Sequence, residues 1–154
     1  MWNYEYRPLL TEINAAVKKA ASPEMTELWK TTKRDVAGWA RAYSREIEIP
    51  FTEAHAIAWS LWEDLYTDPD AWEDGQELLS VSAVEFKGLT PDPLWPDLNF
   101  WTEVAFARAR GFTRQQGIQQ QNDFLAEQGG WDAWYGSRQA GLPPHLTLIE
   151  GGAQ

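Results

Sequence analysis

The sequence predicts an all-α fold: a compact bundle of about six helices, forming a single domain over residues 1–154. Apolar residues recur at spacings of three and four along much of the chain, which is typical of amphipathic helices. Capping residues followed by Pro or an acid mark several helix starts. Hydrophobic residues make up 44% of the 154 residues, enough to bury one core. We also expect a Pro-rich loop at 88–99 and a short extended C-terminal tail.

Two helices are expected in the first third of the chain. An apolar repeat at helical spacing predicts the first helix from about Pro8 to Ala21. The triplet Ser22-Pro23-Glu24 then gives a capping residue, a Pro at the first helical position and an acid in the first turn. This second helix should end at Ile49-Pro50, because a residue before Pro avoids the helical region.

The middle of the chain predicts shorter elements. Thr52 is the expected cap of a third helix reaching Tyr66, and Asp68-Pro69-Asp70 should open a fourth that runs to Leu79. Residues 80–86 have some strand character. Three prolines favour a loop over 88–99.

The last third predicts two helices and a tail. Asp97 or Asn99 can cap a fifth helix that reaches Arg110. Thr113 and Gln116 have the spacing of a capping box, so a sixth helix should begin there and end at Gly129-Gly130. A last short helix is expected over 131–140, and 146–149 is the expected extended tail.

The net charge of −10 is unevenly distributed along the chain. Residues 1–45 sum to +3, residues 46–107 to −13, and residues 108–154 to zero. Lys87 is the single cation of the middle segment, which holds fourteen carboxylates. Such a one-sided field disfavours nucleic acid or an anionic membrane as its partner and favours a basic protein surface. An acidic face that merely maintains solubility is the simpler alternative.

Composition excludes several kinds of site and of location. Cysteine is absent, so the chain has no disulfides and no thiolate metal sites, as expected of a protein in a reducing compartment. The N-terminal residues lack the charged and apolar regions of a signal peptide, and no stretch approaches the roughly 20 apolar residues that span a bilayer. We therefore expect a cytoplasmic location, with no membrane and no cofactor. The small size and the lack of motifs are compatible with a bacterial or phage-infected cell.

The ten tryptophans divide into two expected groups. Trp29, Trp39 and Trp59 have the spacing of core residues. Trp72 and Trp95 lie in acidic or Pro-rich surroundings, and exposed tryptophans are frequent at the centres of protein interfaces. They are the expected apolar anchors of a partner-binding surface. The residues expected in this surface are Asp70, Trp72, Glu73, Asp74, Glu77, Asp92, Trp95 and Asp97.

Catalytic and metal motifs are scarce. His55 and His145 lack further ligands at a recognisable zinc spacing, so a structural role is expected for each. No phosphate-binding Gly-rich loop and no nucleophile elbow is found. Glu24 and Glu27, with a second acidic cluster at 63–77, leave a magnesium-dependent nucleotide hydrolase as an alternative. A later Glu-x-x-Asp pair on a neighbouring helix, which such enzymes need, is missing, so no catalytic or metal-binding residue is assigned.

A cationic cluster supports a different alternative. Arg108, Arg110 and Arg114 surround a Gly-containing turn between two expected helices, with a Gln-rich segment after them. This order is compatible with a helix-turn-helix that binds DNA through the three arginines. An amphipathic helical hairpin with a solvated polar face is the simpler interpretation.

Several short motifs lie within residues of about 33–68 and 100–114. They are the stretch from Lys33 to Ser44, the turn Ile49-Pro50-Phe51, the stretch from Leu61 to Tyr66 followed by Asp68-Pro69, and the triplets at 100–102 and 112–114. Together they resemble the second conserved region of bacterial sigma factors. The resemblance implies a helix from Thr52 to Tyr66 that contacts RNA polymerase. It requires a long acidic insertion near 69–98.

The resemblance weakens where the family's function is most specific. Glu103 to Ala107 stand where sigma factors have aromatic and basic residues that melt promoter DNA, and Glu53 to Ala56 replace the acidic pattern that grips polymerase. The leading expectation is therefore a non-enzymatic protein whose acidic face docks on a basic partner. The partner class is nucleic-acid machinery, inhibited in the manner of a phage-type nucleic-acid mimic, or a basic toxin. A sigma-like or helix-turn-helix transcription module is the alternative, and the oligomeric state is open.

Overall fold

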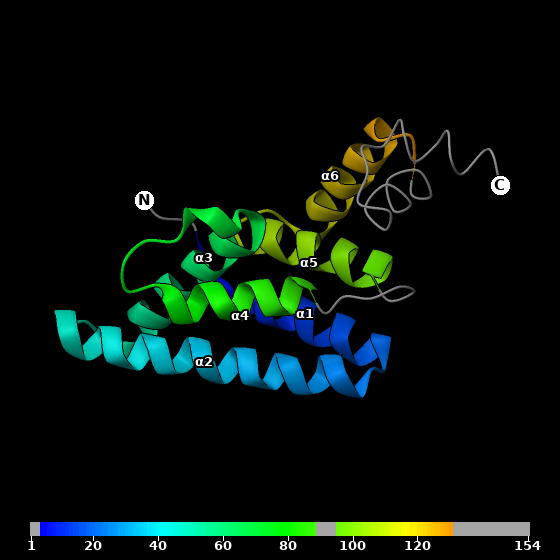
Figure 1. Ribbon diagram of the computed structural model, residues 1–154. Helices are drawn as coiled ribbons and strands as arrows, with labels where there is room; N and C mark the ends of the chain where they lie inside the picture. The colour runs from blue at the N-terminus through cyan, green and yellow to red at the C-terminus, as the bar shows by residue number, and fades with distance from the viewer. Residues whose placement is uncertain (1–3, 89–94, 131–154) are drawn as a thin grey trace.

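The fold is an all-α bundle, as the sequence predicts. The computed structural model describes residues 4–88 and 95–130, and this part of the chain contains six α-helices, one 3-10 turn and no strand (Figure 1). The helices are α1 (Tyr6–Ala20), α2 (Pro23–Ile47), α3 (Phe51–Thr67), α4 (Glu77–Gly88), α5 (Trp95–Ala109) and α6 (Arg114–Glu127), and the 3-10 turn η1 covers Pro69–Ala71.

The helices pack in an order that differs from their order in the sequence. The central α3 lies against α2 and α4, and α4 also contacts α2. The first helix, α1, packs most extensively on α5, and α6 continues from α5 on the side away from α2 (Figure 1). No helix in the described residues is long and apolar enough to cross a membrane.

Two of the predicted helix starts are confirmed by their capping bonds. The Ser22 hydroxyl accepts a hydrogen bond from the Met25 amide, with Pro23 at the first helical position of α2. At α6 the capping box is complete: the Thr113 side chain accepts from the Gln116 amide, and the Gln116 side chain accepts from the Thr113 amide. Both signals are local, because the groups that satisfy the first amides of a helix lie within a few residues.

Other predicted boundaries are wrong. Thr52 does not cap α3, which begins at Phe51 after Pro50 without a side-chain cap. The fourth helix does not start at Asp68-Pro69-Asp70 and reach Leu79; a 3-10 turn stands there, and α4 begins at Glu77. Part of the predicted 88–99 loop is helical, because α5 already starts at Trp95. Residues 89–94, the helix predicted over 131–140 and the tail at 146–149 lie outside the described residues.

The strand character predicted for 80–86 is also wrong, because these residues belong to α4. Leu79, Ala83 and Phe86 recur at helical spacing and are all buried. Their burial against α2 and α3 outweighs the weak strand preference of Val81 and Val84, both of which point to solvent.

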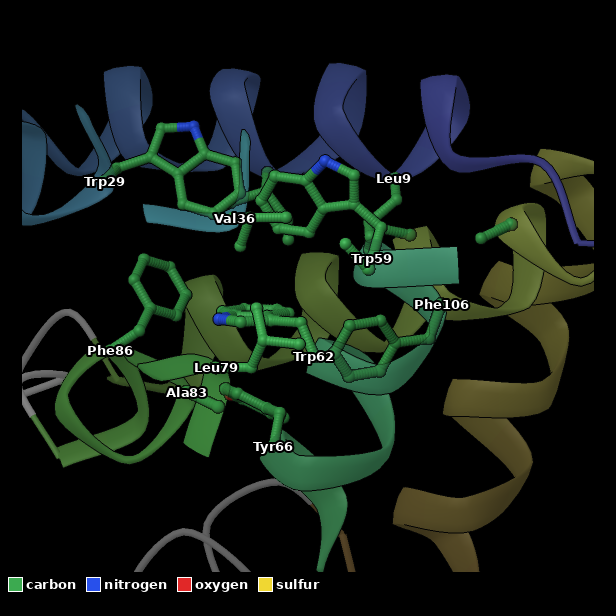
Figure 2. Close-up of a cluster of buried hydrophobic side chains, with 14 of the residues drawn as sticks. Leu9, Trp29, Val36, Trp59, Trp62, Tyr66, Leu79, Ala83, Phe86 and Phe106 are labelled. Atoms are coloured by element: carbon green, nitrogen blue, oxygen red, sulfur yellow. The ribbon is translucent and has the colours of Figure 1, made fainter. Parts of the chain in front are cut away.

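The centre of the bundle is aromatic (Figure 2). Trp59 and Trp62 are fully buried on α3, with ring centroids 5.3 Å apart. Trp29 of α2 lies 5.6 Å from Trp59, and Phe86 of α4 lies 5.7 Å from Trp62. Tilted and edge-on pairs of this kind stabilise a core beyond the area that they bury. The expectation of core positions is confirmed for Trp29 and Trp59, whereas Trp39 is only partly buried.

Candidate protein-binding surface

Nearly all carboxylates of the middle segment point to solvent. Of the eleven between residues 46 and 88, only Glu63 is buried. The single cation of the stretch, Lys87, is half-buried, and its Nζ donates to the Tyr66 carbonyl at 2.9 Å. The exposed carboxylates are Glu46, Glu48, Glu53, Asp64, Asp68, Asp70, Glu73, Asp74, Glu77 and Glu85.

One end of the bundle gathers a group of these carboxylates, which we call the acidic end. It consists of Asp70 from η1, Glu73 and Asp74 from the turn that follows, Glu77 from the start of α4, and Glu46 from the last turn of α2. Glu46 and Asp74 line the same surface hollow, so the two elements meet there. Like charges on neighbouring elements repel one another, and a cationic partner relieves that repulsion.

The turn that carries the acidic end is firmly fixed. Gly75 has a φ of +89°, a backbone conformation that glycine adopts more easily than any other residue. The indole Nε1 of Trp39 donates to the Gly75 carbonyl at 2.7 Å, which ties the turn to α2. The Gln76 side chain accepts from the Glu73 amide at 3.1 Å, and the Gln76 amide donates to the Glu73 carbonyl at 3.0 Å. The carboxylates of this turn therefore stand on an ordered backbone.

Apolar side chains are exposed on the same part of the chain. Trp72 presents 48% of its surface to solvent. On α4, Leu78, Val81 and Val84 follow one another at intervals of three residues and are 45%, 56% and 45% exposed. Residues at this spacing share one side of a helix, so α4 has a buried apolar side and a second apolar side facing outward. We call the outward side the apolar stripe of α4.

The structure brings together part of the surface predicted from the sequence. Asp70, Trp72, Glu73, Asp74 and Glu77 all lie exposed within or beside one turn. Asp92 lies outside the described residues, as do the side chains of Trp95 and Asp97. Sequence reasoning missed Glu46 and the apolar stripe. The apolar stripe could have been predicted from the sequence. When a helix is apolar on nearly all sides, some of its apolar residues cannot face the core.

The arginines of the predicted nucleic-acid site are held by buried carboxylates. Glu12 of α1 is 5% exposed, and its Oε2 accepts from Arg108 Nη1 and from Arg114 Nε, both at 2.8 Å. The Arg114 guanidinium also lies over the Trp101 ring, 4.6 Å from its centroid. These contacts join α1, α5 and α6, which gives both arginines a structural role. Binding of DNA by Arg108, Arg110 and Arg114 stays a prediction.

Arg110, whose side chain is about half-exposed, makes a third ion pair with a buried carboxylate. Its guanidinium contacts the carboxylate of Glu63, which is 1% exposed on α3. Burial raises the pKa of Glu63 to about 7, although the nearby Arg110 opposes the rise. The Glu63 carboxyl therefore changes charge near neutral pH. Like the contacts of Glu12 with Arg108 and Arg114, this pair joins parts of the chain that are distant in the sequence: Glu63 lies on α3, and Arg110 directly follows α5.

The residues considered for catalysis are not brought together. His55 packs between the rings of Tyr6 and Phe51, and its Nε2 accepts from the indole of Trp59 at 3.2 Å. Burial lowers the pKa of His55. Glu24 and Glu27 are exposed at the start of α2, while Glu63 points into the core. Within residues 4–88 and 95–130 no three His, Asp or Glu side chains are placed to hold one metal ion.

Comparison with known proteins gives no match. No family model, no curated protein and no solved structure is similar to the chain. The resemblance to sigma factors thus rests on the sequence motifs alone and stays a prediction.

Proposed function

We propose that the protein is a non-enzymatic binding module, and that its acidic end docks on a basic surface of a protein that handles nucleic acid. The observation that carries this proposal is the combination of exposed apolar and acidic side chains. Trp72 and the apolar stripe of α4 lie on the same segment as Glu73, Asp74 and Glu77, and Lys87 is the only cation between residues 46 and 88. Apolar anchors inside a charged rim are typical of protein interfaces.

The charge pattern favours a basic partner over a second copy of the chain. Two acidic ends facing each other would bring like charges together at a cost, whereas a cationic surface neutralises them. Surfaces that bind DNA or RNA are rich in Lys and Arg, so an acidic module competes with nucleic acid for them. Blocking such a surface would inhibit or regulate the partner. A basic toxin offers the same chemistry and is included in this class.

The experiment is affinity capture from a bacterial extract with three forms of the protein. The test variant carries Glu73→Lys, Asp74→Lys and Glu77→Lys. The matched control carries Glu27→Lys, Asp123→Lys and Glu127→Lys, which change the net charge equally at exposed positions elsewhere. We expect the wild type and the control to capture the same basic protein, and the test variant to lose it.

Two further observations decide the class of partner. Duplex DNA should displace the captured protein, and its association rate with the purified module should fall steeply as salt rises. Capture that is equal for all three forms, or the absence of any captured basic protein, contradicts the proposal. Self-association of the wild type in sedimentation, lost in the test variant, would replace the basic partner with a second copy.

A further inference from the structure

A hollow of about 390 Å³ lies beside the acidic end. It is bounded by the C-terminal part of α2, by the middle of α3 and by the turn at Gly75. Its volume is at the lower end of the range for small-ligand sites, so one long side chain and some water would fill it. Its lining includes Trp39, Tyr43, Glu46, Leu61, Asp74 and Gly75.

One wall of the hollow is aromatic. The rings of Trp39 and Tyr43 stack with centroids 4.8 Å apart and an interplanar angle of 19°. The polar edge of Trp39 is already used, since its Nε1 donates to the Gly75 carbonyl. Both rings line the hollow, and an aromatic ring face attracts cations through its quadrupole.

The rim of the hollow is acidic. Glu46 of α2 and Asp74 of the turn both line the hollow and are exposed, and no cationic side chain is among the described residues that line it. Arg41 and Arg45 stand on the same helix as Glu46 but outside this lining. Anionic ligands would be repelled here, and a neutral apolar ligand would take water from the two carboxylates without replacing it.

We propose that this hollow receives an arginine side chain of the basic partner. A guanidinium is planar, so it can stack on an aromatic ring while its N–H groups bond carboxylates at its edge. The aromatic wall and the acidic rim together suit the guanidinium of arginine better than the ammonium of lysine, which is compact and strongly hydrated. The assignment rests on the proposed function, and it names the contact that anchors the partner on the acidic end.

The experiment uses the whole protein and N-acetylarginine amide as the probe. The indole N–H signal of Trp39, identified by its loss in Trp39→Phe, reports on the hollow in NMR spectra. We expect a saturable shift with a dissociation constant of about 1–10 mM, as one small ligand can reach. N-acetylcitrulline amide, which has the same shape without the charge, should leave the signal in place.

Paired variants test whether the rim makes the contact. Glu46→Gln with Asp74→Asn should weaken arginine binding about fivefold. Asp70→Asn with Glu73→Gln removes the same amount of charge at two positions that do not line the hollow. This pair should change the affinity for the arginine probe less than twofold. Three results would overturn the assignment. They are an equal shift with the citrulline probe, equal weakening of arginine binding by both pairs of variants, and no shift at tens of millimolar arginine probe, which is about ten times the expected dissociation constant.

The two proposals can fail separately. If arginine does not bind but the triple Lys variant still loses its partner, then the acidic end docks without this hollow and only the assignment of the hollow is wrong. If arginine binds as expected but no basic protein is captured, the hollow is a cation site and the proposed function is wrong.

Discussion

Charged side chains have different environments in two regions of the molecule. Around the turn between α5 and α6, Arg108, Arg110 and Arg114 bind the buried carboxylates of Glu12 and Glu63. At the acidic end, five carboxylates stand in solvent on an ordered turn and on the last turn of α2. Buried charges must be paired, because an unpaired one is costly. The first region thus uses charge to hold helices together, and the second presents charge to the outside. Removing charge should accordingly have opposite consequences in the two places.

The largest effect is expected from Arg110→Ala. It leaves the Glu63 carboxylate buried without its partner, which should cost about 3 kcal/mol of unfolding free energy above neutral pH. Below that pH the loss should be smaller, because a protonated carboxyl tolerates burial. Denaturant unfolding at two pH values measures both. Arg34→Ala, an exposed arginine on α2, is the control. A loss as small as that of the control would show that the pair does not hold the fold.

The next effect concerns pH. The pKa of Glu63 is raised from its ordinary 4.5 to about 7, so the folded protein holds this proton more tightly than the unfolded chain. The stability that the proton contributes is fully present below about pH 4.5 and is lost as pH rises through about 7. Glu63→Gln should remove this decline. Unfolding free energies measured across that window for both proteins test it, and parallel curves would contradict the assignment to Glu63.

A smaller effect is expected at the turn of the acidic end. Gly75→Ala meets no atom within 4 Å but must keep a φ near +89°, so it should destabilise the protein by about 1 kcal/mol. Gly88→Ala, at the end of α4 with equally open surroundings, is the matched control and should be neutral or slightly stabilising. Thermal unfolding compares the two. If both changes act alike, the conformation of the turn does not matter.

The smallest effect on stability is expected from neutralising the acidic end itself. Glu73→Gln, Asp74→Asn and Glu77→Gln keep the side-chain shapes and remove repulsion, so the unfolding free energy should change by less than about 0.5 kcal/mol or rise. Partner capture should nevertheless fall. Denaturant unfolding provides the measurement, and a loss of more than about 1 kcal/mol would place these carboxylates among the groups that hold the fold.

The sequence predicts the fold class and two helix starts because those signals are local. Ser22-Pro23 and the Thr113–Gln116 capping box act within one turn, and the structure has both bonds. The boundaries of α4 fail for the opposite reason. Polar and apolar residues partly alternate in α4, which favours a strand. The helix is favoured by the burial of Leu79 and Phe86 against other helices, which the local sequence does not contain.

The candidate surface was predictable in part. Trp72 lies among several carboxylates in the sequence, and unpaired carboxylates are too costly to bury, so this segment is expected to be exposed. That Glu46 joins them depends on how α2 lies against the turn at Gly75, which no local pattern contains. The buried ion pairs could not be predicted either, since the partners of Glu12 lie 96 and 102 residues away.

Those distances along the chain have a consequence for the order of events during synthesis. The apolar side of α1, with Leu9, Ile13 and Val17, leaves the ribosome before α5, the helix on which it mainly packs. This apolar side therefore stays unpacked until α5 has been made, and the contact between Glu12 and Arg114 forms only once α6 follows. Closing so long a loop is slow, and the waiting helix is open to chaperones or to aggregation.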